Sequence, residues 1–361
     1  MEEPAHPTGP KVQVIIPARN EADCLGRCLE SLVSQQGITF QITVVDDNST
    51  DSTRSIAESF AGVRVVTATE PRPGVSGKNN ALICGVQGAS AEWLLFTDAD
   101  TWHYPGSLSA AVAEAEQRGA DLLSYSPEQE LGSWYEAALQ PVVFAELART
   151  YPPDKVNDPT SPITAANGQY ILIKREAYEK VGGHAAVAPE ILEDVGLARK
   201  IQKQGLKLYF RFGDGRVRAR MYRSFSAMWE GWTKNLVRLF NHPLRLALLR
   251  GCEFLSIVGA LVAAIYLFAK GAYLYAPDAL ILSVGLWLLF QARIRRAHAP
   301  QWANLLALLG LPLFVSLLLR SWLHARVLGA VTWKGRQYPN PAPDQPGKSS
   351  TAKESESPAR S

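Results

Sequence analysis

Cysteine is scarce in this sequence, which contains only four among 361 residues. They are Cys24, Cys28, Cys84 and Cys252, and they form no CxxC pair and have no histidines at zinc-binding spacing beside them. This pattern excludes a cysteine-based zinc site and a disulfide framework. We therefore expect four buried thiols in a reducing compartment.

The sequence also has no large excess of positive or negative charge. The formal net charge is +3, which is too small to indicate a nucleic-acid-binding protein, so we expect no nucleic-acid partner. Basic residues are instead concentrated locally, with five arginines between residues 211 and 223. We expect this run to hold anionic lipid headgroups.

The N-terminus has no long hydrophobic run. Residues 1–11 are acidic and contain prolines, so they are not a secretory signal, and we expect them to be disordered and cytosolic. Apolar blocks are confined to 252–269, 280–290 and 302–323. Two of them approach the roughly 20 residues that span a bilayer, so we expect membrane-embedded helices over 244–330. Residues 338–361, rich in Pro, Ser, Lys and Glu, should be disordered.

Basic residues flank the first two apolar blocks and place both flanks on the cytoplasmic side, which predicts a hairpin. These residues are Lys234, Arg238, Arg245, Arg250, Arg293, Arg295 and Arg296. Pro312 interrupts the third block, and we expect it to form a re-entrant pair that returns residues 331–338 to the cytosol, with a full crossing as the alternative.

Between residues 12 and 243 short β-rich runs alternate with amphipathic stretches. This alternation predicts an α/β domain with a largely parallel sheet. The run 93–97 is uninterruptedly apolar, so it should be a central strand that delivers Asp98 and Asp100 to the carboxyl end of the sheet. Ligands bind at that end in open α/β sheets.

Five short segments follow one another in an order that carries more information than any one of them. They are IIPARNEA (15–22), VVDDNSTDST (44–53), GVSGKNNAL (74–82), TDAD (97–100) and LEDVGLARK (192–200). Together they resemble the family 2 glycosyltransferases, over residues 12 to about 240. The resemblance implies a GT-A (Rossmann-like) fold, a nucleotide-diphospho-sugar donor and inverting transfer, and we expect the donor to be a UDP-sugar.

The TDAD segment supplies the predicted metal ligands, Asp98 and Asp100. Carboxylate oxygens are hard ligands that suit Mn²⁺ or Mg²⁺, and such an ion would bridge the diphosphate of the donor. A solvated acidic turn is the alternative interpretation.

Two loops are predicted to bind the nucleotide. The resemblance assigns the nucleobase or ribose to Asp46 or Asp47, whose alternative role is a helix N-cap. It assigns further contacts with the nucleotide to the first loop, through Pro17, Arg19, Asn20 and Glu21. Glu21 could instead complement the dipole of the following helix.

The segment 74–82 places Lys78 and Asn79 where a glycine-flanked loop opens a helix. The ammonium and nearby amides could meet phosphate oxygens there, although a surface lysine is the alternative. In the segment 192–200 the resemblance makes Asp194 the catalytic base and Glu193 an orienting or electrostatic partner. Two adjacent acids also suit an ordinary helix start.

The remaining predicted site residues belong to the sugar and acceptor side. The resemblance implies that Asn167, Gly168 and His184 line the donor-sugar and acceptor pocket, with a structural role as the alternative for His184. Trp232 and Lys234 lie where processive polysaccharide synthases carry a (Q/R)xxRW signature, which this sequence lacks. Polymer synthesis is therefore disfavoured.

The segments GWTKN (231–235) and WKGRQY (333–338) look similar to transferases that glycosylate carotenoids or hopanoids. We therefore predict a multi-pass enzyme of the cell membrane that glycosylates a lipid on the cytoplasmic face. The alternatives are a polyisoprenyl-phosphate glycosyltransferase, a polysaccharide synthase, a sugar nucleotidyltransferase and an inactive membrane scaffold.

Overall fold

The structure is a computed structural model that describes residues 9–190, 192–328, 330–333 and 336–339. Seven strands form its main sheet, in the order β3-β2-β1-β4-β8-β6-β9. Neighbouring strands run parallel except where β8 pairs with β4 and β6, which confirms the predicted α/β fold with a largely parallel sheet. The strands are β1 (Val12–Ala18), β2 (Phe40–Asp46), β3 (Val63–Thr67), β4 (Trp93–Thr97), β6 (Leu122–Ser126), β8 (Tyr170–Lys174) and β9 (Leu208–Phe212).

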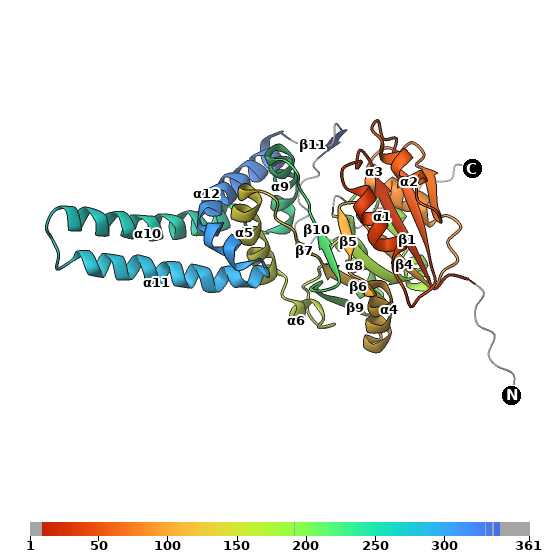
Figure 1. Ribbon diagram of the computed structural model, residues 1–361, viewed down its shortest axis with the longest axis horizontal. Coiled ribbons are helices and arrows are strands. Elements are labelled where there is room, and N and C mark those ends of the chain that lie inside the picture. Colours follow the sequence, from red (N-terminus) through yellow and green to blue (C-terminus); the bar gives the residue numbers. More distant parts are fainter. Residues whose placement is uncertain (1–8, 191, 329, 334–335, 340–361) are drawn as a thin grey trace, which may run out of the picture.

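Helices cover both faces of this sheet (Figure 1). One face packs on α1 (Leu25–Val33), α2 (Thr53–Glu58) and α4 (Ser107–Arg118). The other face packs on α3 (Gly77–Val86), α6 (Pro153–Val156), α7 (Arg175–Lys180) and α8 (Glu193–Lys203). The middle strand, β4, is buried along its whole length, as its apolar sequence predicts.

A short turn and a second, small sheet extend this domain. A 3₁₀ turn, η1 (His184–Val187), precedes α8. The small sheet has the order β5-β10-β7 and consists of β5 (Thr101–His103), β7 (Glu128–Gln129) and β10 (Val217–Ala219). Residues 220–223 follow directly after β10, which ends at Ala219, so the small sheet fixes the position of this segment.

A third hydrophobic core joins the α/β domain to the apolar helices. It is formed by α5 (Trp134–Thr150), α9 (Phe225–Leu239), α10 (Pro243–Ala269), α11 (Ala276–Ile294) and α12 (Gln301–Leu323). A 3₁₀ turn, η2 (Arg295–Ala297), follows α11, and a π-helical turn, η3 (His324–Leu328), follows α12. The predicted domain boundary at 243/244 therefore falls within a shared core.

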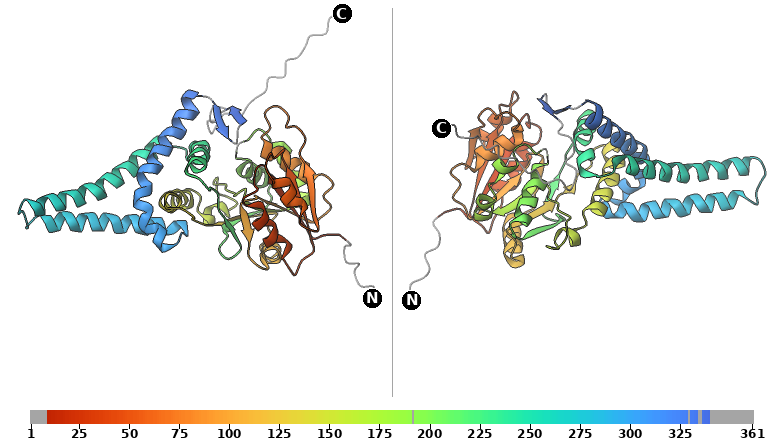
Figure 2. Two further views of the ribbon diagram at one scale, coloured as in Figure 1. Left: turned by 45° about the horizontal axis from the view of Figure 1, so that its top comes forward. Right: turned by 180° about the vertical axis from the view of Figure 1, so that it is seen from behind.

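Three helices are long and apolar enough to cross a membrane in the described part of the chain: α10, α11 continued by η2, and α12 continued by η3. The first two form the predicted hairpin, which projects away from the rest of the protein (Figure 1). The third runs across the base of that hairpin (Figure 2). Within the most apolar 18 residues of each helix, 44% of the stretch in α12 is buried inside the protein, compared with 11% in α10 and 17% in α11.

The expected re-entrant pair in the third block is wrong, because α12 is one continuous helix that contains Pro312. The helix tolerates Pro312 because α12 packs against α5 and α9, and these contacts hold it in place on both sides of the proline. Beyond it, β11 (Ala330–Trp333) pairs with β12 (Arg336–Pro339), and β11 contacts α9.

Ion pairs reinforce the base of the hairpin. Glu146 of α5 is fully buried and pairs with Arg250 of α10, at 2.9 Å, and with Arg293 of α11. Both arginines also pair with Glu253, at 2.9 and 2.6 Å. Two of the predicted cytoplasmic charges are therefore engaged inside the protein, where breaking a pair would leave a buried charge unpaired.

Three of the four cysteines are buried, as predicted, and all four are free thiols. Cys252 is exposed instead, because it lies on the outward side of α10. The two predicted disordered ends fall mostly outside the described residues, which exclude 1–8 and 340–361.

We expect Gly310→Ala to destabilise the protein by about 1–3 kcal/mol, because an added Cβ would lie 2.0 Å from the carbonyl oxygen of Ala138 in α5. The matched control is Gly285→Ala in α11, where an added Cβ meets nothing within 4 Å. Thermal unfolding of both variants in the same detergent measures the difference. Equal stability of the two variants would contradict the close packing of α12 on α5.

Candidate active site

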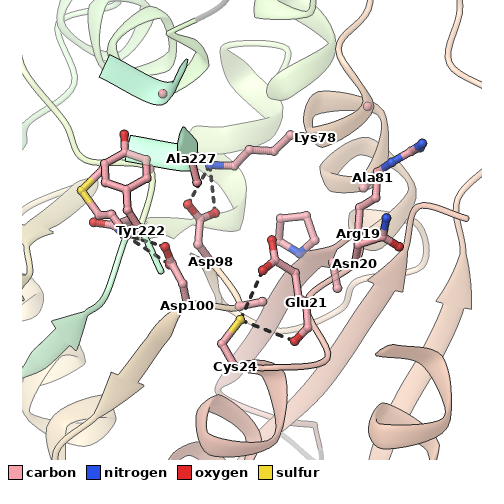
Figure 3. Close-up of a pocket in the computed structure, with 18 of the residues that line it drawn as sticks. Arg19, Asn20, Glu21, Cys24, Lys78, Ala81, Asp98, Asp100, Tyr222 and Ala227 are labelled. Carbon is pink, nitrogen blue, oxygen red and sulfur yellow. Dashed lines mark hydrogen bonds and ion pairs between the residues drawn. The ribbon is translucent and has the colours of Figure 1, made fainter. Parts of the chain in front are cut away.

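A pocket of about 470 Å³ lies at the carboxyl ends of β1 and β4 (Figure 3). A cavity of this size suits a small-molecule ligand. The structure brings most of the predicted site residues to its wall. They are Pro17, Arg19, Glu21, Asp47, Lys78, Asp98, Asp100, Asn167, Gly168, Glu193, Asp194 and Lys234.

Lys78 connects three elements in this pocket. It follows the N-cap Ser76 at the start of α3, and its Nζ lies 2.8 Å from Oδ1 of Asp98 and 3.1 Å from Oε1 of Glu193. The end of β4 and the start of α8, which are about a hundred residues apart in the sequence, therefore meet at one ammonium group. Lys78 is thus a pocket lysine whose charge is shared between two acids.

Asp194 is held beside this lysine by backbone amides. Its Oδ2 accepts a hydrogen bond from the N–H of Gly168 and its Oδ1 from the N–H of Val195, both at 2.8 Å. Burial and then the charge of Glu193 raise the pKa of Asp194 to about 6. Burial would also raise the pKa of Glu193, but the ammonium of Lys78 holds it below its usual value. Asp194 is therefore the more basic carboxylate of the pair.

Gly168 lies against all three charged groups. A Cβ at this position would be 3.2 Å from Nζ of Lys78 and 3.4 Å from carboxylate oxygens of Asp194 and Glu193. A side chain here would compete for the space in which these charges meet. The absence of a side chain thus permits both the close approach and the hydrogen bond from the Gly168 amide.

The two carboxylates after β4 have the chemistry of a partial metal site. Burial and then the neighbouring charge of Asp98 raise the pKa of Asp100 to about 7, and burial raises that of Asp98 despite Lys78. Asp100 accepts a hydrogen bond of 3.2 Å from Nε2 of Gln169. A divalent cation would favour the ionised form of both acids.

Protein ligands alone do not complete such a site. Among the residues that the structure describes, no group of three or more His, Cys, Asp or Glu side chains could hold a metal ion. Mg²⁺ in nucleotide-dependent enzymes is commonly bound by one or two carboxylates together with substrate phosphates and water. Asp98 and Asp100 therefore fit Mn²⁺ or Mg²⁺ in that arrangement.

The loops after β1 and β2 are tied together at the edge of the pocket. Arg19 donates a hydrogen bond of 3.2 Å to the carbonyl oxygen of Asp47, and its Nη1 lies 3.5 Å from Oδ2 of the same residue. Asn20, in the left-handed region with φ of 52°, accepts a hydrogen bond of 2.9 Å from the N–H of Thr50. Of the two aspartates left open by the sequence, Asp47 is the one that lines the pocket.

Four predicted substrate-binding residues do not line the pocket. Oδ1 of Asp46 accepts a hydrogen bond of 3.1 Å from the N–H of Ser49, which closes a turn. The buried amide of Asn79 donates to the carbonyl of Ala188, at 3.1 Å, and so fixes the segment before α8. Both predictions are corrected to structural roles, because neither side chain points into the pocket.

The other two corrections concern aromatic rings. Nδ1 of His184 lies 2.9 Å from the hydroxyl of Tyr178, and burial lowers the pKa of this histidine to about 4, so it is neutral. Trp232 is 2% exposed and packs against Phe144 and Tyr222 in the third core. Its neighbour Lys234 reaches the pocket because it lies on a different face of α9.

Several pocket residues were not predicted from the sequence. They are Asp23, Cys24, Arg220, Met221, Tyr222, Arg223, Ala227, Gly231 and Asn235. Tyr222 enters the wall because Gly231 has no side chain, since a Cβ there would lie 2.5 Å from the ring. The concentration of arginines between residues 211 and 223 is the sequence feature that could have indicated Arg220 and Arg223 as pocket residues.

Part of this arginine-rich run forms ion pairs within the protein. Arg211 pairs with Glu114 at 2.8 Å, Arg218 with Glu128 at 2.6 Å, and Arg220 with Glu136 at 3.4 Å. These three arginines connect the irregular part of the domain through ion pairs. Lipid binding by this run stays a prediction, and the three ion pairs show that part of its charge is balanced within the protein.

Similarity to known proteins identifies this fold and pocket as those of a glycosyltransferase. Residues 13–182 match the model of glycosyl transferase family 2. The chain thus carries a family 2 glycosyltransferase domain and is a glycosyltransferase. The 4,4'-diaponeurosporenoate glycosyltransferases of Staphylococcus aureus strains MRSA252 and USA300 are each 29% identical to it over 339 residues, which cover 90% of this chain and 87% of theirs.

Solved structures with a similar overall course of the chain include two glycosyltransferase complexes. The mannosyltransferase PcManGT from Pyrobaculum calidifontis, in complex with GDP-Man and Mn²⁺, has a TM-score of 0.49 and 19% identity, covering 87% of this chain and 86% of its own. Residues 1–349 of S. aureus TarS, in complex with UDP-GlcNAc, have a TM-score of 0.43 and 14% identity, covering 91% and 95%.

We expect Lys78→Gln to lower the thermal stability of the ligand-free protein, because Asp98 and Glu193 would repel each other without the shared ammonium. The loss should be roughly 1–3 kcal/mol. The matched control is Lys174→Gln, which breaks an ion pair of 3.2 Å with Asp121 at a similarly exposed lysine. If the two variants lost the same stability, Lys78 would be an ordinary surface ion pair.

Proposed function

We propose that the protein transfers a sugar, with inversion, from a nucleoside-diphosphate sugar to a lipid acceptor at the cytoplasmic face of the cell membrane. The observation that carries the proposal is the meeting of Asp98, Glu193 and Asp194 around Lys78 in one pocket. This arrangement supports the proposal because it gathers, in one pocket, acids that can serve the leaving diphosphate and an acid that can serve the attacking acceptor.

The donor binds against the α/β half of the pocket. Pro17, Arg19, Glu21 and Asp47 contact the nucleoside, and a UDP-sugar is the donor that we favour. Asp98 and Asp100 would hold Mn²⁺ or Mg²⁺, which would supply positive charge against the negative charge that develops on the leaving diphosphate. Lys78 adds a positive charge on the same side.

Asp194 accepts the proton of the acceptor oxygen as that oxygen attacks. Its amide hydrogen bonds fix the carboxylate, and its raised pKa of about 6 leaves it ionised at neutral pH but more basic than an ordinary aspartate. A single displacement by this oxygen inverts the anomeric carbon. Asn167 and Gly168 then border the donor sugar.

A lipid acceptor is supported by the position of α9. This helix lines the pocket with one face and packs on α12 with another, so the pocket adjoins the apolar helices. We propose that α10 and α11 cross the bilayer. The S. aureus relatives are named for a carotenoid acid, diaponeurosporenoate, which supports an acceptor of carotenoid or hopanoid type. A polyisoprenyl phosphate and a polysaccharide are the other candidate acceptors.

Incubation of the purified full-length protein with a total lipid extract, Mn²⁺ or Mg²⁺ and a panel of labelled nucleoside-diphosphate sugars tests this function. We expect label in a small lipid of the organic phase. Label in a polymer would favour a polysaccharide synthase. Absence of label from the lipid fraction with every donor would contradict the proposal.

We expect Asp194→Asn to bind the donor normally but to transfer sugar at least about a hundredfold more slowly, since an amide cannot accept the proton. Isothermal titration with the nucleoside diphosphate and single-turnover kinetics separate the two effects. Asp23→Asn, which neutralises an exposed acid at the rim of the same pocket, is the matched control. Undiminished turnover of Asp194→Asn would reject the assigned base.

A further inference from the structure

The helix α12 is predominantly apolar, but only one of its faces is buried in the protein. Its buried residues recur every three or four positions, from Ala303 to Ser321, and pack on α5 and α9. The other face carries large apolar side chains that are between 46% and 61% exposed, namely Trp302, Leu305, Leu309, Leu319 and Leu323. We call these five residues the α12 stripe. An apolar stripe of this length indicates a surface that is covered by something other than water.

The start of α12 is held by the α/β domain. The turn before the helix contains His298, whose Nδ1 lies 3.0 Å from Oδ2 of Asp214. The ring of His298 also stacks on that of Phe212, the last residue of β9, with the ring centroids 4.2 Å apart. The preceding turn, η2, contacts α5. The first residues of α12 therefore lie beside the main sheet.

The end of α12 is held by α9, which lines the pocket. The N–H of Val237 in α9 donates a hydrogen bond of 2.9 Å to Oγ of Ser321 in α12. The guanidinium of Arg320 lies 6.0 Å from the ring centroid of Trp229 in α9. Beyond α12, the strand β11 contacts the same helix. Both ends of α12 are therefore attached to the part of the protein that contains the active site.

The direction of α12 differs from that of the hairpin. In both figures α12 runs across the base of the hairpin that α10 and α11 form (Figure 1, Figure 2). Near that base, Nε2 of Gln291 in α11 donates a hydrogen bond of 3.0 Å to the carbonyl oxygen of Asn304 in α12. If α10 and α11 cross a bilayer, a helix that runs across their base lies along the surface of that bilayer.

Aromatic side chains gather near the end of α12. Their ring centroids follow one another at distances of 5.5 to 5.9 Å, and the residues are Trp134, Tyr135, Phe225 and Trp229. Trp134 and Phe225 are exposed, as is Trp302 near the start of α12. Trp and Tyr are enriched where a protein meets the boundary between lipid and water, because their rings are apolar and also carry a polar group. Exposed aromatic rings at both ends of α12 thus fit a helix that stays at this boundary.

We propose that α12 lies in the plane of the membrane, with the α12 stripe in the acyl region of the leaflet that faces the α/β domain. The chain then crosses the bilayer twice, through α10 and α11, and β11 and β12 return to the side of the active site. The length and composition of α12 permit a crossing. A crossing would carry the two ends of α12 to opposite sides, whereas His298 and Ser321 bind the same part of the protein.

This inference goes beyond the proposed function, because it assigns a membrane-binding surface to a helix that the function does not use. It rests on the proposed crossing of the bilayer by α10 and α11. An in-plane α12 also sets the position of the pocket, because α9 packs on α12 and contributes Ala227, Gly231 and Asn235 to the pocket. A lipid acceptor could then reach the pocket while its chain remains in the leaflet.

Fluorescence quenching by lipids tests the orientation of α12. The parent is the full-length Cys252→Ser protein, whose other three cysteines are buried. Single cysteines carry an environment-sensitive fluorophore at four exposed positions of α12 that are seven residues apart: Trp302→Cys, Leu309→Cys, Ser316→Cys and Leu323→Cys. The proteins are reconstituted in liposomes of phosphatidylcholine and phosphatidylglycerol that contain lipids with a nitroxide at known depths.

We expect the four positions of α12 to lie at one depth. A crossing helix would instead place position 316 about 10 Å closer to the bilayer centre than position 323, since each residue rises about 1.5 Å. The matched control is the pair Leu255→Cys and Val262→Cys in α10, which are exposed and also seven residues apart. We expect this pair to differ in depth by about 10 Å.

Two results of the depth measurement would overturn the proposal. One is a difference in depth along α12 as large as that along α10. The other is the absence of quenching by lipids at all four positions, which would indicate that a second copy of the chain covers the α12 stripe. All six labelled positions are exposed, so the substitutions leave the packing of the core unchanged.

Reaction of single cysteines with a membrane-impermeant maleimide tests the two crossings. Gln117→Cys, at an exposed position of α4, reports the side of the α/β domain. In intact cells and inverted vesicles, we expect Arg326→Cys in η3 to react from the same side as Gln117→Cys, and Lys270→Cys at the tip of the hairpin from the opposite side. Reaction of Arg326→Cys from the side opposite to Gln117→Cys would overturn the proposal.

The proposed function and this inference fail in different ways. If the wild-type protein transfers no label to any lipid, the lipid glycosyltransferase function is wrong, whatever the orientation of α12. If Lys270→Cys reacts from the same side as Gln117→Cys, the hairpin does not cross the bilayer and the two crossings are wrong. If the protein labels a lipid and the hairpin crosses, but depth varies along α12, only the in-plane helix is wrong.

Discussion

The ammonium of Lys78 is the interaction on which the rest of the site depends. Carboxylates at the end of β4 and at the start of α8 lie in one partly desolvated pocket, where like charges repel strongly. Lys78 contacts Asp98 and Glu193 within 3.1 Å and offsets that repulsion. Burial raises the pKa of Asp100 and Asp194, and also that of Asp98 despite its contact with Lys78. Of these four acids, only Glu193 has its pKa held below the usual value, by the charge of Lys78.

A second constraint couples this site to the apolar helices. Side chains of α5 and α9 share one continuous hydrophobic core with the three apolar helices. The apolar helices therefore do not pack as a separate unit from α9, which lines the pocket. Gly310 lets α12 approach the backbone of α5, and Glu146 draws the base of the hairpin onto the same helix. The side of the pocket that α9 lines is therefore held by the apolar helices, which makes its geometry dependent on how those helices pack.

Sequence reasoning succeeded where a pattern reports directly on the environment of a residue. The apolar run 93–97 indicated a central strand, and it is the middle strand of the sheet. It failed for α5, because residues 136–146 are buried on all sides and show no amphipathic period. It also failed for Asn79 and Trp232, since each is adjacent to pocket residues in the sequence but points into the protein.

The sequence by itself determined the alternating α/β fold, the order of the acidic motifs and the existence of three apolar helices, because strand and helix periodicity and hydrophobic length are local properties. Only the tertiary structure decided which of two aspartates lines the pocket, that Lys78 bridges two distant carboxylates, and that α12 stays continuous through Pro312. It alone also brought Arg220, Arg223 and Lys234 to the pocket. The physical reason is that side-chain direction and long-range electrostatics depend on packing between elements, which local sequence patterns do not encode.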